Sequence, residues 1–410
     1  AIAAVLGLAS CTPSPGDGAG PIRVGALYPL SGSQGPGGVD EFRGVRLAAD
    51  LANLEGGVAG RPFELVPLDV PAADAAPGAV AALRDGGVRL VIGSYGSTIS
   101  SVIARSTAAS GMLFWETGAV GMLPADARRG ELTFRMPPTG GVLGRNAIAF
   151  VADRLAGELG RPADDLRYGV ASVDDVYGRS VAAGALAELR ERGLRVVGRF
   201  RYDARAVDMR SLARAIASRR VDVLFVSAYL EDGVAMREAL VEERVPLVAA
   251  IGTSSSYCMP EFGEALGPDA VGLFASDKPD AGAIDPDGLA PAAADVLRRA
   301  DAAYRERWGA GMSPAALAGF SAAWALFREV LPAAGTDDPW DVAAAANAAD
   351  LPDGSLPNGS GLRFGAPGSR EAGDNVRAAG VIWEWIRPGE HVVVWPPAFA
   401  THDVVALPIR

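Results

Sequence analysis

The sequence predicts an α/β protein of two lobes, each built on a doubly wound parallel sheet, with a multi-strand hinge between them. The chain has 410 residues, which is longer than a single hydrophobic core usually grows. From residue 22 onward, short β-branched runs alternate with helical stretches, a pattern typical of parallel sheets with crossover helices. The alternation stops at the Pro-Pro-Thr-Gly-Gly stretch 137–141 and then restarts. The restart indicates a second lobe.

The first lobe is predicted from alternating strand and helix patterns. Apolar residues recur at helical spacing over 41–54, and the continuous apolar run 88–92 is typical of a buried strand. The strands are expected at 22–28, 63–68, 88–92, 112–115 and 133–136, and the helices at 41–54, 75–84 and from about 98 to 109.

The second lobe follows the same alternation and ends in long helices and a hairpin. The segment Arg387-Pro388-Gly389-Glu390 is expected to be the hairpin turn. Strands are expected at 168–173, 195–202, 221–226, 247–251, 271–275, 362–364, 380–386 and 392–395. Helices are expected at 143–159, 176–192, 209–218, 232–243, 261–266, 290–308, 314–330 and 339–348. We expect lobe 1 to comprise 22–139 and 277–372, and lobe 2 to comprise 140–276 and 373–410.

The N-terminal segment 1–21 is interpreted as a signal-peptide remnant, a lipobox and a linker. Residues 1–8 are an apolar run too short to span a bilayer. Small residues follow, as at a signal cleavage site, and Leu8-Ala9-Ser10-Cys11 resembles the lipobox of bacterial lipoproteins. We therefore expect Cys11 to be lipidated. The alternative is a disordered N-terminus with an accidental cysteine.

Composition argues against several other functions. The formal net charge is −11 and no Lys/Arg cluster occurs, which argues against nucleic acid as a partner. The two histidines, His391 and His402, have no cluster of ligands beside them, so neither a metal nor another cofactor is expected. Cys258 has no partner for a disulfide once Cys11 is lipidated, and is expected to be an unreactive, partly buried thiol. No G-x-S-x-G elbow with a suitably placed histidine occurs, so no enzyme is expected.

Two parallel sheets place their binding crevices at the carboxyl ends of the strands. If the lobes face each other, the strand-end loops of both line one cleft, and a ligand that contacts both lobes favours closure.

Several segments in this order and spacing resemble one family, the type I periplasmic solute-binding proteins of ABC importers, in the leucine/isoleucine/valine-binding branch. The residues that carry the resemblance are 22–32, with its Pro-Leu-Ser-Gly turn, 42–50, the Gly-Gly-Val-Ala-Gly-Arg loop 56–61, 91–93, 174–178 and 314–324. The resemblance implies a monomeric subunit that captures a small molecule and works with an ABC permease and ATPase. With the lipobox, it implies a location on the outer face of the cytoplasmic membrane, or in the periplasm. The alternative is a sensor of the same fold with a separate signalling partner.

The resemblance also implies ligand-binding positions. The ligand carboxylate in that family is held at the start of the helix after the third strand, which maps to Ser97 and Thr98. A helix N-terminus favours an anion on physical grounds alone. The alternative is that Ser97 only caps its own helix. The other lining positions map to Gly118, Ala119, Val120, Tyr177, Tyr229 and Gly252. The alternative for the two tyrosines is packing at the rim of the lobe.

At several positions where the family contacts its ligand, this sequence has other residue types, which bears on the identity of the ligand. Amino-acid binders of this branch hold the ammonium with a threonine and a carboxylate, and these positions are Val120 and Gly252 here. Aromatic positions map to Gly37 and Ala315, so the pocket is expected to be wider. The pattern argues against a simple aliphatic α-amino acid and favours a bulkier carboxylate, an aromatic acid, an amide or a short peptide. Glu116, Asp277 and Lys278 follow strands and are candidates to supply charge to the cleft.

Overall fold

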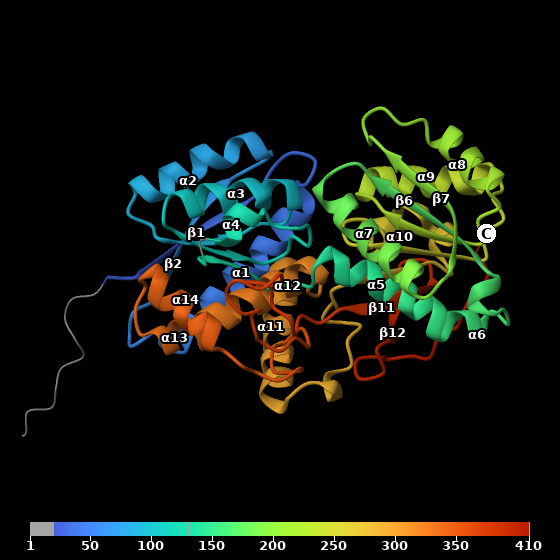
Figure 1. Ribbon diagram of the computed structural model, residues 1–410. Helices are drawn as coiled ribbons and strands as arrows, with labels where there is room; N and C mark the ends of the chain where they lie inside the picture. Colours follow the sequence, from blue (N-terminus) through green and yellow to red (C-terminus); the bar gives the residue numbers. More distant parts are fainter. Residues whose placement is uncertain (1–19, 130, 410) are drawn as a thin grey trace, which may run out of the picture.

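The computed structural model describes residues 20–129 and 131–409, and shows two α/β lobes side by side (Figure 1). In the first lobe, all neighbouring strands are parallel, in the order β2-β1-β3-β4-β5. Their bounds are β1 Ile22–Tyr28, β2 Phe63–Asp69, β3 Leu90–Gly93, β4 Leu113–Glu116 and β5 Thr133–Arg135.

Helices cover both faces of this sheet because successive strand residues point to opposite sides. Val91 packs with α2 (Ala76–Asp85) and α3 (Ser97–Ala109), whereas Ile92 belongs to the core that includes α1 (Gly35–Leu54). This sheet is therefore buried on both faces. The remaining helices of this lobe are α4 Ala125–Arg129, α11 Pro291–Trp308, α12 Pro314–Ala325, α13 Leu331–Ala334 and α14 Pro339–Ala348, with a π-helical turn, Leu326–Val330, between α12 and α13.

Glycine allows α1 and α12 to cross at backbone contact. A Cβ added at Gly44 of α1 would lie 1.9 Å from the carbonyl oxygen of Ala316, and one at Gly319 of α12 would lie 2.3 Å from that of Glu41. No larger residue fits at either position without separating the helices. This crossing places Glu41 and the N-terminal end of α1 at the inner edge of the lobe.

The second lobe contains the sheet β12-β11-β10-β9-β8-β6-β7, which is parallel except for β11 and β12. Its strands are β6 Arg167–Val173, β7 Arg195–Tyr202, β8 Val223–Ser227, β9 Ala249–Thr253, β10 Phe274–Asp277, β11 Val381–Arg387 and β12 Glu390–Trp395. Its helices are α5 Gly140–Phe150, α6 Ala156–Glu158, α7 Val176–Glu191, α8 Met209–Ser218, α9 Leu230–Glu242 and α10 Pro260–Leu266. The predicted hairpin is confirmed, because β11 and β12 pair antiparallel across Pro388-Gly389.

The structure differs from the sequence-based expectations in several places. The helix expected at 41–54 begins earlier, at Gly35, and the short helix Ala125–Arg129 was not expected. The strand expected at 362–364 is wrong: Leu362 and Phe364 make only isolated bridges. The strand expected at 271–275 begins later, at Phe274, because Gly272 has a φ of +83° that breaks an extended run. The helix expected at 143–159 begins at Gly140, where the Thr139 side chain accepts a hydrogen bond from the Val142 amide, and it passes through a π-helical turn, Val151–Leu155.

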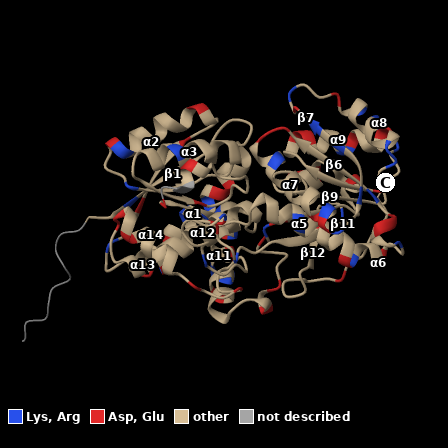
Figure 2. Cartoon of the chain, viewed as in Figure 1, with Lys and Arg blue, Asp and Glu red and all other residues tan. Residues whose placement is uncertain are grey.

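The predicted fold class, two parallel-sheet lobes, is confirmed by this architecture. The chain passes between the lobes after β5, after β10 and before β11. The residue boundaries given above for the two lobes stay a prediction. Basic and acidic side chains are interspersed over both lobes (Figure 2). Within the described residues, every helix is too short or too polar to cross a bilayer.

Candidate ligand-binding cleft

The two lobes meet at a cavity of about 670 Å³. The first lobe contributes the start of α1, Tyr95 after β3, and the segment around Tyr304 to Ala315. The second lobe contributes Ser255 after β9 and the start of α10. Asp277 and Lys278, at the end of β10, complete the wall. The cavity therefore lies at the carboxyl ends of strands from both sheets, where open parallel sheets bind their ligands.

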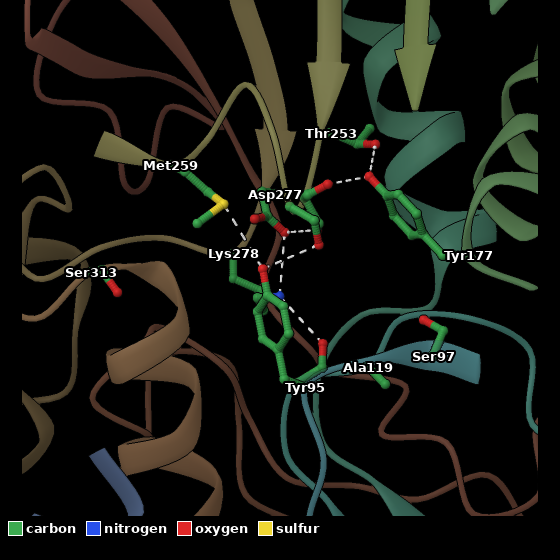
Figure 3. A network of polar contacts seen from close by, with 12 residues as sticks. Tyr95, Ser97, Ala119, Tyr177, Thr253, Met259, Asp277, Lys278 and Ser313 are labelled. Atoms are coloured by element: carbon green, nitrogen blue, oxygen red, sulfur yellow. Dashed lines mark hydrogen bonds and ion pairs between the residues drawn. The ribbon is translucent and has the colours of Figure 1, made fainter. Parts of the chain in front are cut away.

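A second, much smaller cavity of about 10 Å³ lies beside the first, with room for no more than about one water molecule. Tyr95, Ser255 and Lys278 line both cavities and so form the partition between them. The remaining lining residues of the small cavity are Gly96, Ser97, Gly118, Val120, Tyr177, Tyr229 and Ser254. Figure 3 shows Tyr95 between the Ser97 side and the Ser313 side.

Tyr95 bridges the lobes. Its hydroxyl donates a hydrogen bond to Ser255 Oγ at 3.3 Å and lies 3.9 Å from the Met259 sulfur (Figure 3). Its ring packs against Gly37, where an added Cβ would lie 2.4 Å from the tyrosine Cζ. Gly37 and Ala315 both line the large cavity, as expected from the missing aromatic rings. At Gly37, however, the Tyr95 ring takes part of the space that a ring at position 37 would need.

Lys278 is the only lysine in the chain, among 38 Lys and Arg residues. Its side chain is nearly inaccessible, with the residue 4% exposed, and it lies in the cleft (Figure 3). Its Nζ lies 3.6 Å from Asp277 Oδ1 and donates to the carbonyl oxygen of Gly118 at 3.3 Å. Burial disfavours the ammonium form, but the Asp277 and Glu41 carboxyl groups outweigh burial and raise the pKa of Lys278 above its usual value. The lysine is therefore charged at neutral pH.

Asp277 is held from two sides. It accepts a hydrogen bond from the Ser254 hydroxyl and pairs with Lys278. Cys258 lines the same wall, and burial, together with Asp277, raises the pKa of its thiol well above the usual value, so the thiol stays protonated. Within residues 20–129 and 131–409, no group of three or more His, Cys, Asp or Glu side chains could hold a metal ion.

Ser97 lies where the sequence places it, at the start of α3 and on the wall of the small cavity. Its hydroxyl accepts a hydrogen bond from the Gly121 amide at 3.0 Å, and Gly96 is the N-cap of the helix, so Ser97 does not cap α3. In the described part of the chain, the amides of Ser97, Thr98 and Ile99 have no hydrogen-bond acceptor, as is usual in the first turn of a helix. The Thr98 side chain lines neither cavity.

The loop after β4 contributes Gly118 and Val120 to the small cavity, but not Ala119 or Glu116. Glu116 is completely buried and accepts hydrogen bonds from the amides of Ser94, Gly118 and Ala119 and from the Ser100 hydroxyl. Burial raises its pKa to about 7, although these hydrogen bonds lower it. Glu116 thus holds the loop and lines neither cavity, and its expected role in ligand binding stays a prediction.

Glu41 of α1 is a buried carboxyl group that the sequence reading missed. One oxygen accepts a hydrogen bond from the Thr117 hydroxyl at 2.6 Å, and the other, Oε2, has no partner among the described residues. A Cβ at Gly118 would lie 1.7 Å from this Oε2, so Glu41 lies directly behind the Gly118 backbone. Burial and the neighbouring Glu116 raise the pKa of Glu41 well above its usual value.

Tyr177 and Tyr229 line the small cavity from the second lobe, with their ring centroids 5.3 Å apart. The Tyr177 hydroxyl contacts Thr253 Oγ1 at 2.9 Å and donates to the Ser254 carbonyl oxygen (Figure 3). The Tyr229 hydroxyl donates to Asp175 Oδ2 at 2.6 Å. Both tyrosines are inside the cleft rather than at the rim.

Gly252 is not brought to either cavity. It lies within β9, and an added Cβ would be 2.1 Å from the Tyr257 ring, which covers this position. Ser254, two residues further on, lines the small cavity instead, and Thr253 contacts the Tyr177 hydroxyl. The outer wall of the large cavity includes Glu261 and Glu264 of α10, both exposed.

Comparisons with known proteins agree with this architecture. A family model described as periplasmic binding protein matches residues 21–376. The chain is 28% identical over 381 residues to the Leu/Ile/Val-binding protein homolog 8 of Brucella abortus, covering 92% of this chain and 90% of the relative.

Solved structures share the fold at low sequence identity. The leucine-binding protein LivK of Thermotoga maritima superposes with a TM-score of 0.75 at 18% identity, covering 91% of this chain and 97% of that one. A solute-binding protein of R. palustris in complex with benzoate has a TM-score of 0.73 at 18% identity, covering 94% and 99%. LivJ of Streptococcus pneumoniae in complex with isoleucine has a TM-score of 0.72 at 17% identity, covering 92% and 100%.

Two facing α/β lobes with a cleft at their strand ends are the arrangement expected of a solute-binding protein. The chain belongs to the periplasmic binding protein family. Its similarity to the Leu/Ile/Val-binding protein homolog of Brucella relates it to proteins named for branched-chain amino acid binding. Members of this family are substrate-binding proteins rather than enzymes.

Proposed function

We propose that this protein captures a small carboxylate-bearing solute, other than a simple aliphatic α-amino acid, in the cleft between its lobes. Closure of the lobes about the hinge then presents the loaded protein to its permease. The observation that carries the proposal is the cavity of about 670 Å³, with the charged Lys278 in its wall. This volume is within the usual range for small-molecule sites.

The composition of the cleft supports a ligand other than leucine, isoleucine or valine. Val120 lines the small cavity and has no side-chain acceptor for an ammonium group, and Gly252 lies behind Tyr257. Gly37 and Ala315 leave the large cavity wider than paired aromatic rings would. The family itself admits both kinds of ligand, since one structural relative holds isoleucine and another holds benzoate.

The proposal is tested by a thermal-shift screen of amino acids, aromatic acids, amides and short peptides with the purified protein. We expect the largest rise in melting temperature with a carboxylate larger than leucine, because a ligand that binds only the folded state stabilises it. A largest shift with leucine, isoleucine or valine would contradict the proposal.

We further propose that Cys11, which lies outside the described residues, is lipidated and anchors a monomeric protein to the outer face of the cytoplasmic membrane. Cys11→Ser should release the protein from the membrane fraction into the soluble extracytoplasmic fraction, measured by fractionation and immunoblot. Cys258→Ser is the control, since this thiol is buried, and it should leave membrane association unchanged. Retention of the Cys11→Ser protein in membranes would contradict the anchor.

A further inference from the structure

The basic residues of this chain are arginines at every position except one. The exception, Lys278, is also buried in the wall where the lobes meet. Charged groups are rarely buried without a partner or a function. A lysine ammonium has three hydrogen-bond donors. In the described part of the chain, Asp277 and the Gly118 carbonyl oxygen take two of them. One donor is left at a group that borders both cavities.

The acceptors around Lys278 already have donors from the protein. Asp277 accepts from Ser254 and Lys278, and the Gly118 carbonyl oxygen accepts from Lys278. The Ser254 carbonyl oxygen accepts from Tyr177, and Asp175 accepts from Tyr229. A ligand ammonium placed here would have to displace one of these donors, and an unpaired buried ammonium is costly.

The donors around Lys278 are in the opposite situation. The amides of Ser97, Thr98 and Ile99 at the start of α3 have no acceptor within the described residues. Burial raises the pKa values of Glu41 and Glu116, the two buried glutamates nearest the cleft, and so reduces the negative charge that they add at neutral pH. The groups around Lys278 thus offer donors and a fixed cation, and Arg43 adds a second positive charge to the wall of the large cavity. Glu41 Oε2, which has no donor among the described residues, lies behind the Gly118 backbone and lines neither cavity.

We infer that Lys278 binds the ligand carboxylate and occupies the place of a ligand ammonium, so that the substrate class is carboxylic acids without an α-amino group. This inference rests on the proposed function and narrows it. The protein supplies the ammonium itself, fixed by Asp277 and the Gly118 backbone. An acid with an apolar or aromatic body would direct its carboxylate to Lys278 and its body into the large cavity.

The test compares acids that differ only in the amino group. Isothermal titration of the purified protein would use 3-phenylpropanoate against phenylalanine, and 4-methylpentanoate against leucine. We expect the acid of at least one pair to bind at least about tenfold tighter than its amino counterpart, about 1.4 kcal/mol. Tighter binding of the amino acid in both pairs would overturn the inference.

Variants at the ion pair separate a ligand contact from a structural pair. Lys278→Met should weaken binding of the acid at least about tenfold, whereas Asp277→Asn, which keeps the ammonium group but removes one of its two anchors, should cause a smaller loss. A purely structural pair would make both variants weaken binding alike. The double variant Asp277→Asn/Lys278→Met, which buries no unpaired charge, should keep the wild-type circular dichroism spectrum and still fail to bind the acid.

Arg179→Met is the control for long-range charge effects. Arg179 is an exposed arginine two residues after Tyr177, paired with Asp174, and lines neither cavity. It should bind the acid as the wild type does; a loss equal to that of Lys278→Met would overturn the inference. If none of the four compounds binds, the inference is overturned. If another class of solute then raised the melting temperature in the thermal-shift screen, the proposed binding function would stand without this inference. If no solute raised the melting temperature, the proposed function would be contradicted as well.

Discussion

The Ser97 hydroxyl holds a neighbouring loop and is also placed to bind a ligand. It accepts from the Gly121 amide and borders the small cavity. Ser97→Ala should weaken binding of the acid identified by titration about tenfold, because a donor to the ligand and the anchor of the Gly121 loop are both lost. Titration calorimetry would measure the change.

Ser101→Ala is the matched control for Ser97→Ala. Ser101 is one turn further along α3, is buried, lines neither cavity, and donates its hydroxyl to the Ser97 carbonyl oxygen. The Ser101→Ala variant should bind the acid with the affinity of the wild type. An equal loss in both variants would mean that the helix, not the Ser97 hydroxyl, is the cause.

Glu116 predicts a pH dependence of stability. Its pKa is about 7 in the folded protein against an ordinary value of 4.5, so the folded state binds this proton more tightly than the unfolded state. Its contribution to the free energy of unfolding is therefore full below pH 4.5 and falls by about 3 kcal/mol as the pH rises to about 7. Urea unfolding from about pH 5 to about pH 8 would measure this fall.

Glu116→Gln should reduce the decrease in the free energy of unfolding between about pH 5 and about pH 8, because glutamine does not titrate. It should also lower stability by about 2 kcal/mol, because its amide group meets donors where the carboxyl oxygens accepted them. Glu64→Gln, at an exposed position of β2, should keep the wild-type pH profile. An unchanged profile in Glu116→Gln would show that other groups cause the pH dependence.

At the scale of single residues, the sequence predicted which residues lie in the cleft better than it predicted which side chains contact each other there. Ser97, Tyr177 and Tyr229 lie in the cleft because they directly follow strands, which the alternating pattern locates. It missed Tyr95 and Glu41, because their places depend on Gly37 and on the crossing of α1 with α12. One signal was present in the sequence: Lys278 as the only lysine.

At the scale of elements, the close crossing of α1 and α12 predicts that Gly44 cannot be replaced by a residue with a side chain. Gly44→Ala should destabilise the protein by about 2 kcal/mol or more, because its Cβ would meet the Ala316 carbonyl oxygen at 1.9 Å. Thermal unfolding would measure it. Gly78→Ala is the control, in α2 with no atom near its added Cβ, and should be neutral or stabilising by up to about 1 kcal/mol. Equal stability of the two variants would contradict the proposed packing.

The order and type of most elements were readable from periodicity, since each strand and helix has one buried face. The exceptions have local causes. Gly272 shortens β10 through its positive φ, and residues 362–364 are extended but pair only through isolated bridges. The pairing of β11 with β10 joins segments far apart in the chain, and periodicity carries no information about such a partner.

At the scale of the whole molecule, the rate of chemical labelling of Lys278 measures how often the two lobes separate. In the structure described here the residue is 4% exposed, with Tyr95 and Ser255 bonded across the lobes. An amine-reactive reagent should modify it only when the lobes separate, so a bound ligand should slow its labelling at least about tenfold. Because the chain has one lysine, peptide mass spectrometry would follow this single site.

A reference peptide with one free amine, labelled in the same solution, is the control, and its labelling rate should not change with ligand. Tyr95→Phe, which loses the hydrogen bond to Ser255, should raise the labelling rate of Lys278 without ligand. Rapid labelling of Lys278 that ligand does not alter would contradict closure over the lysine.

The acidic outer wall of the cavity has a consequence for the rate of capture. Glu261 and Glu264 are exposed there, on a chain with a net charge of −11. An anion approaching this mouth is repelled before it reaches Lys278, so association is slow at low ionic strength and accelerates as salt screens the repulsion. Under the proposed function, a high affinity for such a solute would therefore have to come from slow dissociation rather than from fast association.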